Sequence, residues 1–173
     1  SEADTTLLQA YELFNKAVAA SNLTGQASAE YYYELMNKKY PANPYTSDAK
    51  STLAVEFINL AQDKVNQYLG CQSDQSVKQK QDFFEAGLRL ERAIKIIGED
   101  DVDYASALMG RMYLLKASGD FGKEGKNGDI AIAFQNAYAA LSIDPYGAYI
   151  QNKLAILHSE NNRKDSALYY ANK

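Results

Sequence analysis

The sequence predicts an all-α fold, built as a stack of about four antiparallel helical hairpins. Apolar residues recur three and four positions apart along most of the chain, as at Leu53, Phe57, Ala61 and Val65, and this is the helical period. No stretch shows the strict alternation of a half-buried strand. The breaks between periodic stretches are mostly short, which favours antiparallel neighbours.

The apolar period and its breaks predict eight helices in order along the chain. The expected ranges are 4–21, 27–39, 47–69, 78–97, 102–118, 129–142, 147–160 and 163–172. Paired in sequence, they give hairpins over about 4–40, 47–97, 102–142 and 147–173. A length of 173 residues suits one domain, so we expect residues 1–173 to form a single repeat domain.

Prolines mark two of the breaks between helices. Pro41 and Pro44 are expected to end the second helix and to keep residues 40–46 extended, because a proline ring disfavours the helical region for the residue before it. Ser47 and Asp48 then offer side-chain oxygens to cap the third helix. Asp144 and Pro145 form the same kind of break before the seventh helix.

Composition and charge exclude several classes of protein. The 18 basic residues are outnumbered by 22 acidic ones and are scattered along the chain, which makes nucleic acid a poor candidate partner. Cys71 is the only cysteine, so an internal disulfide framework and a cysteine-based zinc site are excluded. No apolar run approaches the roughly 18 residues that a membrane span needs. The first residue is Ser1 rather than Met, as in a processed precursor or a piece of a longer chain.

Small residues recur where paired helices are expected to cross, because helices approach to about 8 Å only where neither carries a bulky side chain. First-helix positions are Ala17, Ala54, Gly110 and Ala155, and their second-helix partners are Ala29, Ala86, Ala133 and Ala167. The spacings within these pairs are 12, 32, 23 and 12 residues. The two outer hairpins are therefore expected to be regular, and the two inner ones to carry insertions.

The end of the chain resembles a tetratricopeptide repeat. The resemblance is carried by LAILHSENNRKDSALYYANK from Leu154, by the preceding IAFQNAYAALSIDP, and more diffusely by AEYYYELMNKKYPANPY from Ala29 and GRMYLLKASGD from Gly110. The tyrosine–proline turn is similar to that of bacterial envelope members of the family. The resemblance implies a right-handed superhelical solenoid and a location in the periplasm or cell envelope.

The insertions predict a protruding edge on the stack. The apolar pattern overruns the second crossing through residues 62–86, which predicts a long helical arm that closes near residues 70–77. Residues 119–129 contain four glycines and no apolar period, so they are expected to form an exposed loop. Both insertions fall at the same kind of turn and should emerge along one edge.

No residue pattern points to catalysis, a metal or a cofactor, so we expect a protein that is not an enzyme. His158, the only histidine, occupies a register position where an aromatic ring normally packs between helices. The acidic run from Glu99 to Asp103 stands just before a helix, where carboxylates cap the helix and meet its positive end. Cys71 is expected to be an incidental thiol, and the glycines of 119–129 lack the lysine and hydroxyl spacing of a phosphate loop.

The resemblance also implies which residues line a binding groove, since first-helix residues of each repeat face the concave side in this family. The candidates are Tyr11, Phe14, Asp48, Val55, Tyr104, Arg111, Tyr149 and Asn152, and Ser51 and Ala107 occupy equivalent positions. In chaperone-binding members a lysine and an asparagine at the fifth and ninth positions of one repeat hold a carboxylate, and the pairs Phe14 with Val18 and Ser51 with Val55 cannot do that. The groove is therefore expected to accept an apolar or aromatic segment rather than an acidic tail.

Two functions remain open from the sequence. The first is a scaffold that binds a protein or peptide in the groove or along the protruding edge. The alternative is the helical part of a larger envelope protein that binds glycan or another small ligand, with Tyr104 and Tyr149 as stacking faces. Because the last hairpin lacks a polar capping helix, we also expect either that the chain continues past Lys173 or that this end self-associates.

Overall fold

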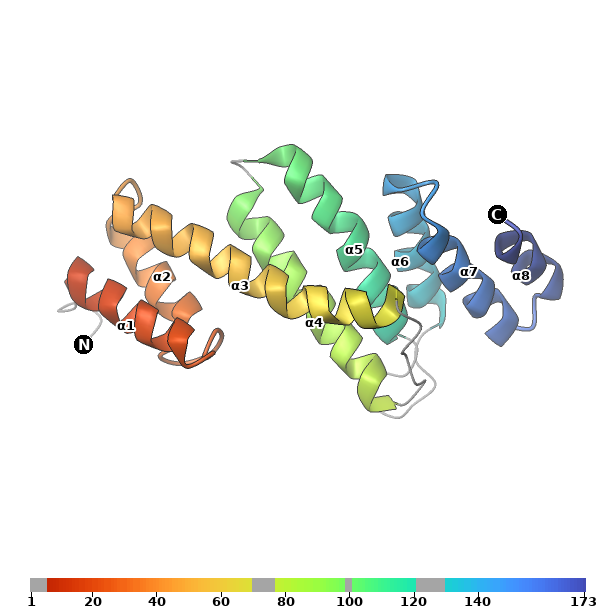
Figure 1. Cartoon of the computed structure of the whole chain (residues 1–173), viewed down its shortest axis with the longest axis horizontal. Coiled ribbons are helices and arrows are strands. Elements are labelled where there is room, and N and C mark those ends of the chain that lie inside the picture. The colour runs from red at the N-terminus through yellow and green to blue at the C-terminus, as the bar shows by residue number, and fades with distance from the viewer. Residues whose placement is uncertain (1–5, 70–76, 99–100, 121–129) are drawn as a thin grey trace. The chain divides into compact units, whose positions relative to one another are not determined.

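The computed structural model describes residues 6–69, 77–98, 101–120 and 130–173, and these residues form helices and turns without a strand. The helices are α1 Leu7–Ala19, α2 Ala29–Lys39, α3 Pro44–Leu69, α4 Val77–Ile97, α5 Val102–Asp120, α6 Ile130–Ile143, α7 Ala148–Glu160 and α8 Lys164–Ala171 (Figure 1). The all-α prediction is confirmed, and the predicted helix boundaries lie within three residues of those observed. None of the described helices combines the length and apolar character needed to cross a membrane.

The chain divides into two compact units, one ending at Asn59 and the other beginning at Leu60. The first unit contains α1, α2 and the beginning of α3, and the second contains the rest of α3 and α4 to α8. Each unit is described by itself below. The single domain over 1–173 stays a prediction.

In the first unit, local hydrogen bonds define the helices α1 and α2. Thr6 begins α1 with a reciprocal capping box, in which its Oγ1 accepts from the Gln9 amide and the Gln9 side chain accepts from the Thr6 amide. Ser28 caps α2 by accepting from the Tyr31 amide at 3.2 Å. The two helices pack together, and Phe14 and Met36 lie in their core. The predicted first hairpin is therefore present.

The predicted start of α3 is wrong. The helix begins at Pro44, and Asn43 caps it, because the Asn43 Oδ1 accepts from the Tyr45 amide at 3.0 Å and the Asn43 carbonyl accepts from Thr46 and Ser47. Proline suits the first turn of a helix, where its missing N–H would have no partner within the helix. Ser47 therefore lies inside the first turn and does not cap it.

In the second unit the helices pack against their neighbours in chain order, α4 on α5, α5 on α6, α6 on α7 and α7 on α8 (Figure 1). Helix α7 also reaches α5. Around α6 and α7 the core consists of alanines from α5 and α6 and of larger aliphatic residues from α7. Its buried members are Ala117, Ala133, Ala137, Ala140, Ile150, Leu154 and Leu157.

The small residues marked in the sequence occupy the interior with one exception. Ala17, Ala54, Gly110, Ala155, Ala29, Ala86 and Ala133 are buried, whereas Ala167 is half-buried. At Gly110 an added Cβ would lie 3.4 Å from the Cγ2 of Ile143, which is ordinary contact. Small residues thus do mark interior positions along this chain.

Helices α4 and α5 approach each other closely at Gly87, which the small-residue pattern did not mark. A Cβ at Gly87 would stand 2.9 Å from the Cγ of Lys116, 3.2 Å from its backbone nitrogen and 3.3 Å from the carbonyl oxygen of Met112. Lys116 also pairs with Glu91 across the same two helices at 3.2 Å. Helices α4 and α5 therefore meet almost backbone to backbone at this point.

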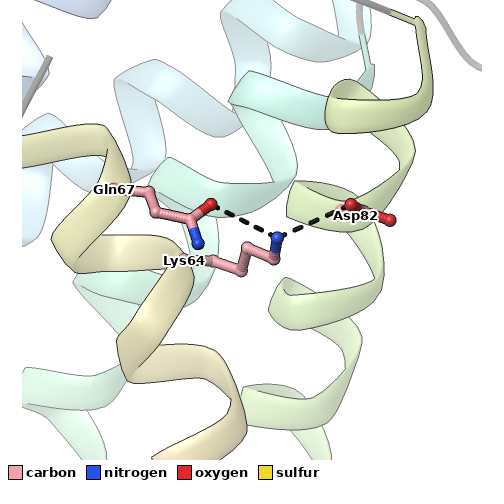
Figure 2. Close-up of polar contacts among 3 residues, drawn as sticks. All are labelled: Lys64, Gln67 and Asp82. Carbon is pink, nitrogen blue, oxygen red and sulfur yellow. Dashed lines mark hydrogen bonds and ion pairs between the residues drawn. The ribbon is translucent and has the colours of Figure 1, made fainter. Parts of the chain in front are cut away.

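The predicted helical arm at 62–86 is present in its described parts. Helix α3 continues to Leu69 and α4 begins at Val77, and both Val65 and Phe83 are buried. Figure 2 shows Lys64 joining the helices, with its Nζ 3.5 Å from Asp82 and 3.3 Å from Gln67. Residues 70–76 and 121–129 lie outside the described residues, so the protruding edge stays a prediction. Residues 119 and 120 belong to α5 rather than to the predicted loop.

Candidate functional site

The eight residues predicted for a groove fall into different surroundings. Phe14 is wrong as a groove residue, because its side chain is 0% exposed and packs in the core of the first unit. Its register position specified a face of α1 but not which other helix covers that face. The other seven residues are at least partly exposed, and the structure relates two pairs of them: Tyr11 with Asp48 in the first unit, and Arg111 with Tyr149 in the second.

In the first unit, Tyr11, Tyr45 and Asp48 form a cluster of two rings and a carboxylate. The Tyr11 hydroxyl donates to the Asp48 Oδ2 at 2.5 Å, and the ring centroids of Tyr11 and Tyr45 lie 4.8 Å apart. The hydrogen bond to Asp48 raises the pKa of Tyr11. Val55 is exposed further along α3. Tyr45 was not predicted as a groove residue. It lies next to Pro44 in the first turn of α3.

In the second unit, two hydrogen-bonded pairs make up a group that we call the polar row: Arg111 of α5 with Gln62 of α3, and Tyr149 of α7 with Asp144, which follows α6. The Arg111 Nη1 donates to the Gln62 Oε1 at 3.1 Å, and the Tyr149 hydroxyl donates to the Asp144 Oδ2 at 2.7 Å. Burial and the bond to Asp144 raise the pKa of Tyr149 to about 12, while the nearby charge of Arg111 acts in the opposite direction. The charge of Arg111 therefore acts on the Tyr149 hydroxyl, and a groove that contains both residues stays a prediction.

Two more predicted residues lie on the same helices as this row. Tyr104 on α5 is exposed, and its backbone amide is capped by the Asp101 carboxylate at 2.9 Å. Asn152 on α7 is also exposed. Gln62 and Asp144 were not predicted as site residues. Asp144 was interpreted only as a helix break, although an aspartate five residues before a tyrosine can reach its hydroxyl.

His158 lies in an aromatic stack, as predicted. Its ring is 4% exposed, is parallel to that of Tyr170 at 5.4 Å between centroids, and lies 4.7 Å from that of Phe134. Its Nε2 is 3.1 Å from the Tyr138 hydroxyl. Burial, assisted by the positive charge of Arg163, lowers the pKa of His158, so the ring is neutral at pH 7.

A pocket of about 330 Å³ opens at the junction of α6, α7 and α8, and the sequence did not predict it. Its lining is aromatic and polar, and consists of Leu141, Pro145, Tyr146, Gln151, Tyr169, Tyr170 and Lys173. Three of the fourteen tyrosines converge here from two separate segments. Tyr169 and Tyr170 belong to the segment from Leu154 that carries the repeat resemblance, and that resemblance does not imply a pocket.

A second depression, of about 460 Å³, lies between α7 and α8 and is mainly apolar. Ala155, Ile156, Ala167, Leu168 and Ala171 form most of its lining. The helix α8 has no buried residue. This helix therefore leaves the apolar side of the last hairpin open within the described chain.

Within residues 6–69, 77–98, 101–120 and 130–173, no group of three His, Cys, Asp or Glu side chains is placed to hold a metal ion. Within the predicted acidic run, Asp101 caps α5 as expected. Glu99, Asp100, Cys71 and the glycines at 122–128 lie outside the described residues.

Comparisons of this chain with models of protein families, with curated proteins and with solved structures found no match. A function is therefore inferred from the chain's own residues. The two features that offer chemistry to a ligand are the polar row on α3, α5 and α7 and the tyrosine-lined pocket at α6–α8.

Proposed function

We propose that the chain is a non-enzymatic scaffold of the tetratricopeptide type, a superhelical stack of helical hairpins that holds a protein or peptide. The observation that carries this proposal is the polar row, in which Arg111 of α5 bonds to Gln62 of α3 and its charge acts on the Tyr149 hydroxyl of α7. In the proposed stack these are the first helices of three successive hairpins. A surface built from successive first helices suits an extended segment.

Arg111 is the central group of this surface. A guanidinium has five N–H donors, and the bond to Gln62 accounts for one of them. Those donors can meet backbone carbonyls of a bound segment, and the Tyr149 ring and exposed Tyr104 provide aromatic contact area. The proposed partner is a segment with apolar or aromatic side chains, bound by its backbone at Arg111.

The repeat assignment has support of its own. The helices lie where the periodicity placed them, seven of the eight marked small residues are buried, and the outer two hairpins have the 12-residue spacing of the family. Phe14 is the exception among the proposed groove residues. The groove on the second unit therefore consists of Arg111, Tyr149, Asn152 and Tyr104.

A peptide-display selection against the whole chain tests this function. Selected peptides should share an apolar or aromatic core, and Arg111→Ala together with Asn152→Ala should weaken their binding by about tenfold or more. Arg89→Ala on α4 removes the same charge away from the row and should leave binding unchanged. Selected peptides that bind both variants equally well would contradict the proposal.

A further inference from the structure

The pocket at α6–α8 offers chemistry that the polar row lacks. Tyr146 is 96% exposed, so its ring takes almost no part in packing the fold. Tyr169 is more than half exposed and stands at 83° to the ring of Tyr170, with 5.1 Å between centroids. The two rings form a corner, and Tyr146 adds a third aromatic surface to the same pocket.

The wall formed by Tyr170 is held in place by a chain of contacts that leads into the core. The Tyr170 hydroxyl lies 3.5 Å from the Tyr138 hydroxyl, which in turn lies 3.1 Å from the Nε2 of buried His158. The Tyr170 ring also stacks on the His158 ring. Burial and the contact with Tyr138 raise the pKa of Tyr170 to about 12, so its hydroxyl stays protonated. A fixed wall of this kind reduces the ordering cost of binding a ligand.

Hydrogen-bonding groups alternate with these rings around the pocket. Gln151 donates from its Nε2 to the Pro145 carbonyl at 3.1 Å, which orients the amide, and its Oε1 is buried without a partner among the described residues. The Lys173 ammonium lies 5.0 Å from the centre of the Tyr169 ring. Among the side chains of the described lining, this lysine is the charged one, and none is an aspartate or a glutamate. A cationic ligand is therefore disfavoured, and a neutral or anionic one is favoured.

We propose that this pocket binds a saccharide, neutral or carrying a uronic acid. A pyranose ring presents C–H faces that pack on tyrosine rings, and hydroxyls that exchange hydrogen bonds with amide, phenol and ammonium groups. A volume of about 330 Å³ is at the lower end of the range for small-ligand pockets. An apolar peptide side chain finds a more suitable surface in the neighbouring α7–α8 depression, whose lining is mostly alanine, isoleucine and leucine.

A glycan array with neutral and uronate oligosaccharides, probed with the whole chain and followed by titration calorimetry, tests this inference. Tyr146→Ala and Tyr169→Ala should each weaken binding by about tenfold. Tyr40→Ala is the matched control, because Tyr40 is an exposed tyrosine at the end of α2 that is not among the residues lining the pocket, and it should leave saccharide binding unchanged. Lys173→Ala should weaken the binding of uronates and spare neutral sugars.

Tyr146→Ala is also the variant least able to disturb the fold, so its thermal unfolding midpoint should equal that of the parent chain. The inference is overturned if no saccharide on the array binds, or if bound saccharides retain their affinity in both tyrosine variants. A selected peptide that is lost with Tyr146→Ala, with no saccharide bound, would assign the pocket to a peptide instead. The effect of Arg111→Ala on peptide binding tests the polar row, and the effect of the tyrosine variants on saccharide binding tests the pocket. The two proposals can therefore fail separately.

Discussion

The first and last hairpins share one spacing and differ in burial. In both, 12 residues separate the marked alanines, Ala17 from Ala29 and Ala155 from Ala167. In the first hairpin, α2 buries Ala29, Tyr33 and Met36, whereas α8 of the last hairpin buries no residue and Leu168 is 62% exposed. The spacing thus specifies where two helices cross. What else packs on the second helix decides how deeply it is buried.

The largest expected difference in stability between the two hairpins comes from truncating one apolar side chain in each. Phe14→Ala removes a fully buried ring and should lower the free energy of unfolding by about 3–5 kcal/mol. Leu168→Ala removes a side chain that is mostly in water and should change it by less than about 0.5 kcal/mol. Urea unfolding of both variants measures the difference. A large loss for Leu168→Ala would mean that α8 is covered in solution.

Enlarging the marked alanines should give a smaller difference in stability loss between the two hairpins. Ala29 is 0% exposed, so Ala29→Leu overpacks the crossing of α1 and α2 and should destabilise by about 1–3 kcal/mol. Ala167→Leu has room in the open depression beside α7 and should be nearly neutral. The same urea curves report both changes. Equal costs at the two positions would show that the spacing alone determines burial.

Acid should act on the last hairpin through the only histidine of the chain. Because burial lowers the pKa of His158 in the folded state, the unfolded state binds the proton more readily as pH falls below about 6.5. Stability should therefore be full at pH 7.5 and fall by up to about 1.4 kcal/mol by pH 5.5. Urea midpoints at the two pH values in the parent chain and in His158→Phe measure this effect. An unchanged pH dependence in the variant would exclude His158 as its source.

The smallest expected difference concerns the helix caps. Ser28 accepts from the Tyr31 amide at the start of α2, and Ser28→Ala should cost about 1 kcal/mol. Helix α8 has no side-chain cap at Arg163, so Arg163→Ala should cost less than about 0.5 kcal/mol. Thermal unfolding of the two variants gives the comparison. If Arg163→Ala cost as much stability as Ser28→Ala, the loss would be assigned to the contact between the Arg163 guanidinium and the Phe134 ring.

The helices were predictable because their causes are local. The apolar period and the Asp101 cap can be read from neighbouring residues, and the structure shows this cap. The Ser28 cap is equally local, although the predicted helix 27–39 included Ser28. The start of α3 was missed because Pro44 was taken only as a helix breaker, whereas a proline in the first turn is compatible with a helix.

The site was less predictable because it depends on contacts between distant segments. Arg111 and Tyr149 were placed on one face from the repeat register, but Gln62 lies 49 residues from its partner Arg111 and has no local signal. Phe14 had the right register and the wrong environment. Tyr146 and Tyr169 come together only when α6, α7 and α8 are packed, so no spacing along the chain could indicate their pocket.

The crossing at Gly87 limits which sequences can keep this arrangement of α4 and α5. Alanine is a better helix former than glycine by about 1 kcal/mol, so replacing an exposed glycine here with alanine would stabilise the helix. The backbone of α5 stands within 3.3 Å of where that extra carbon would lie. In related chains with the same crossing, this position should therefore remain glycine, and a larger residue there would identify a chain whose α4 and α5 stand further apart.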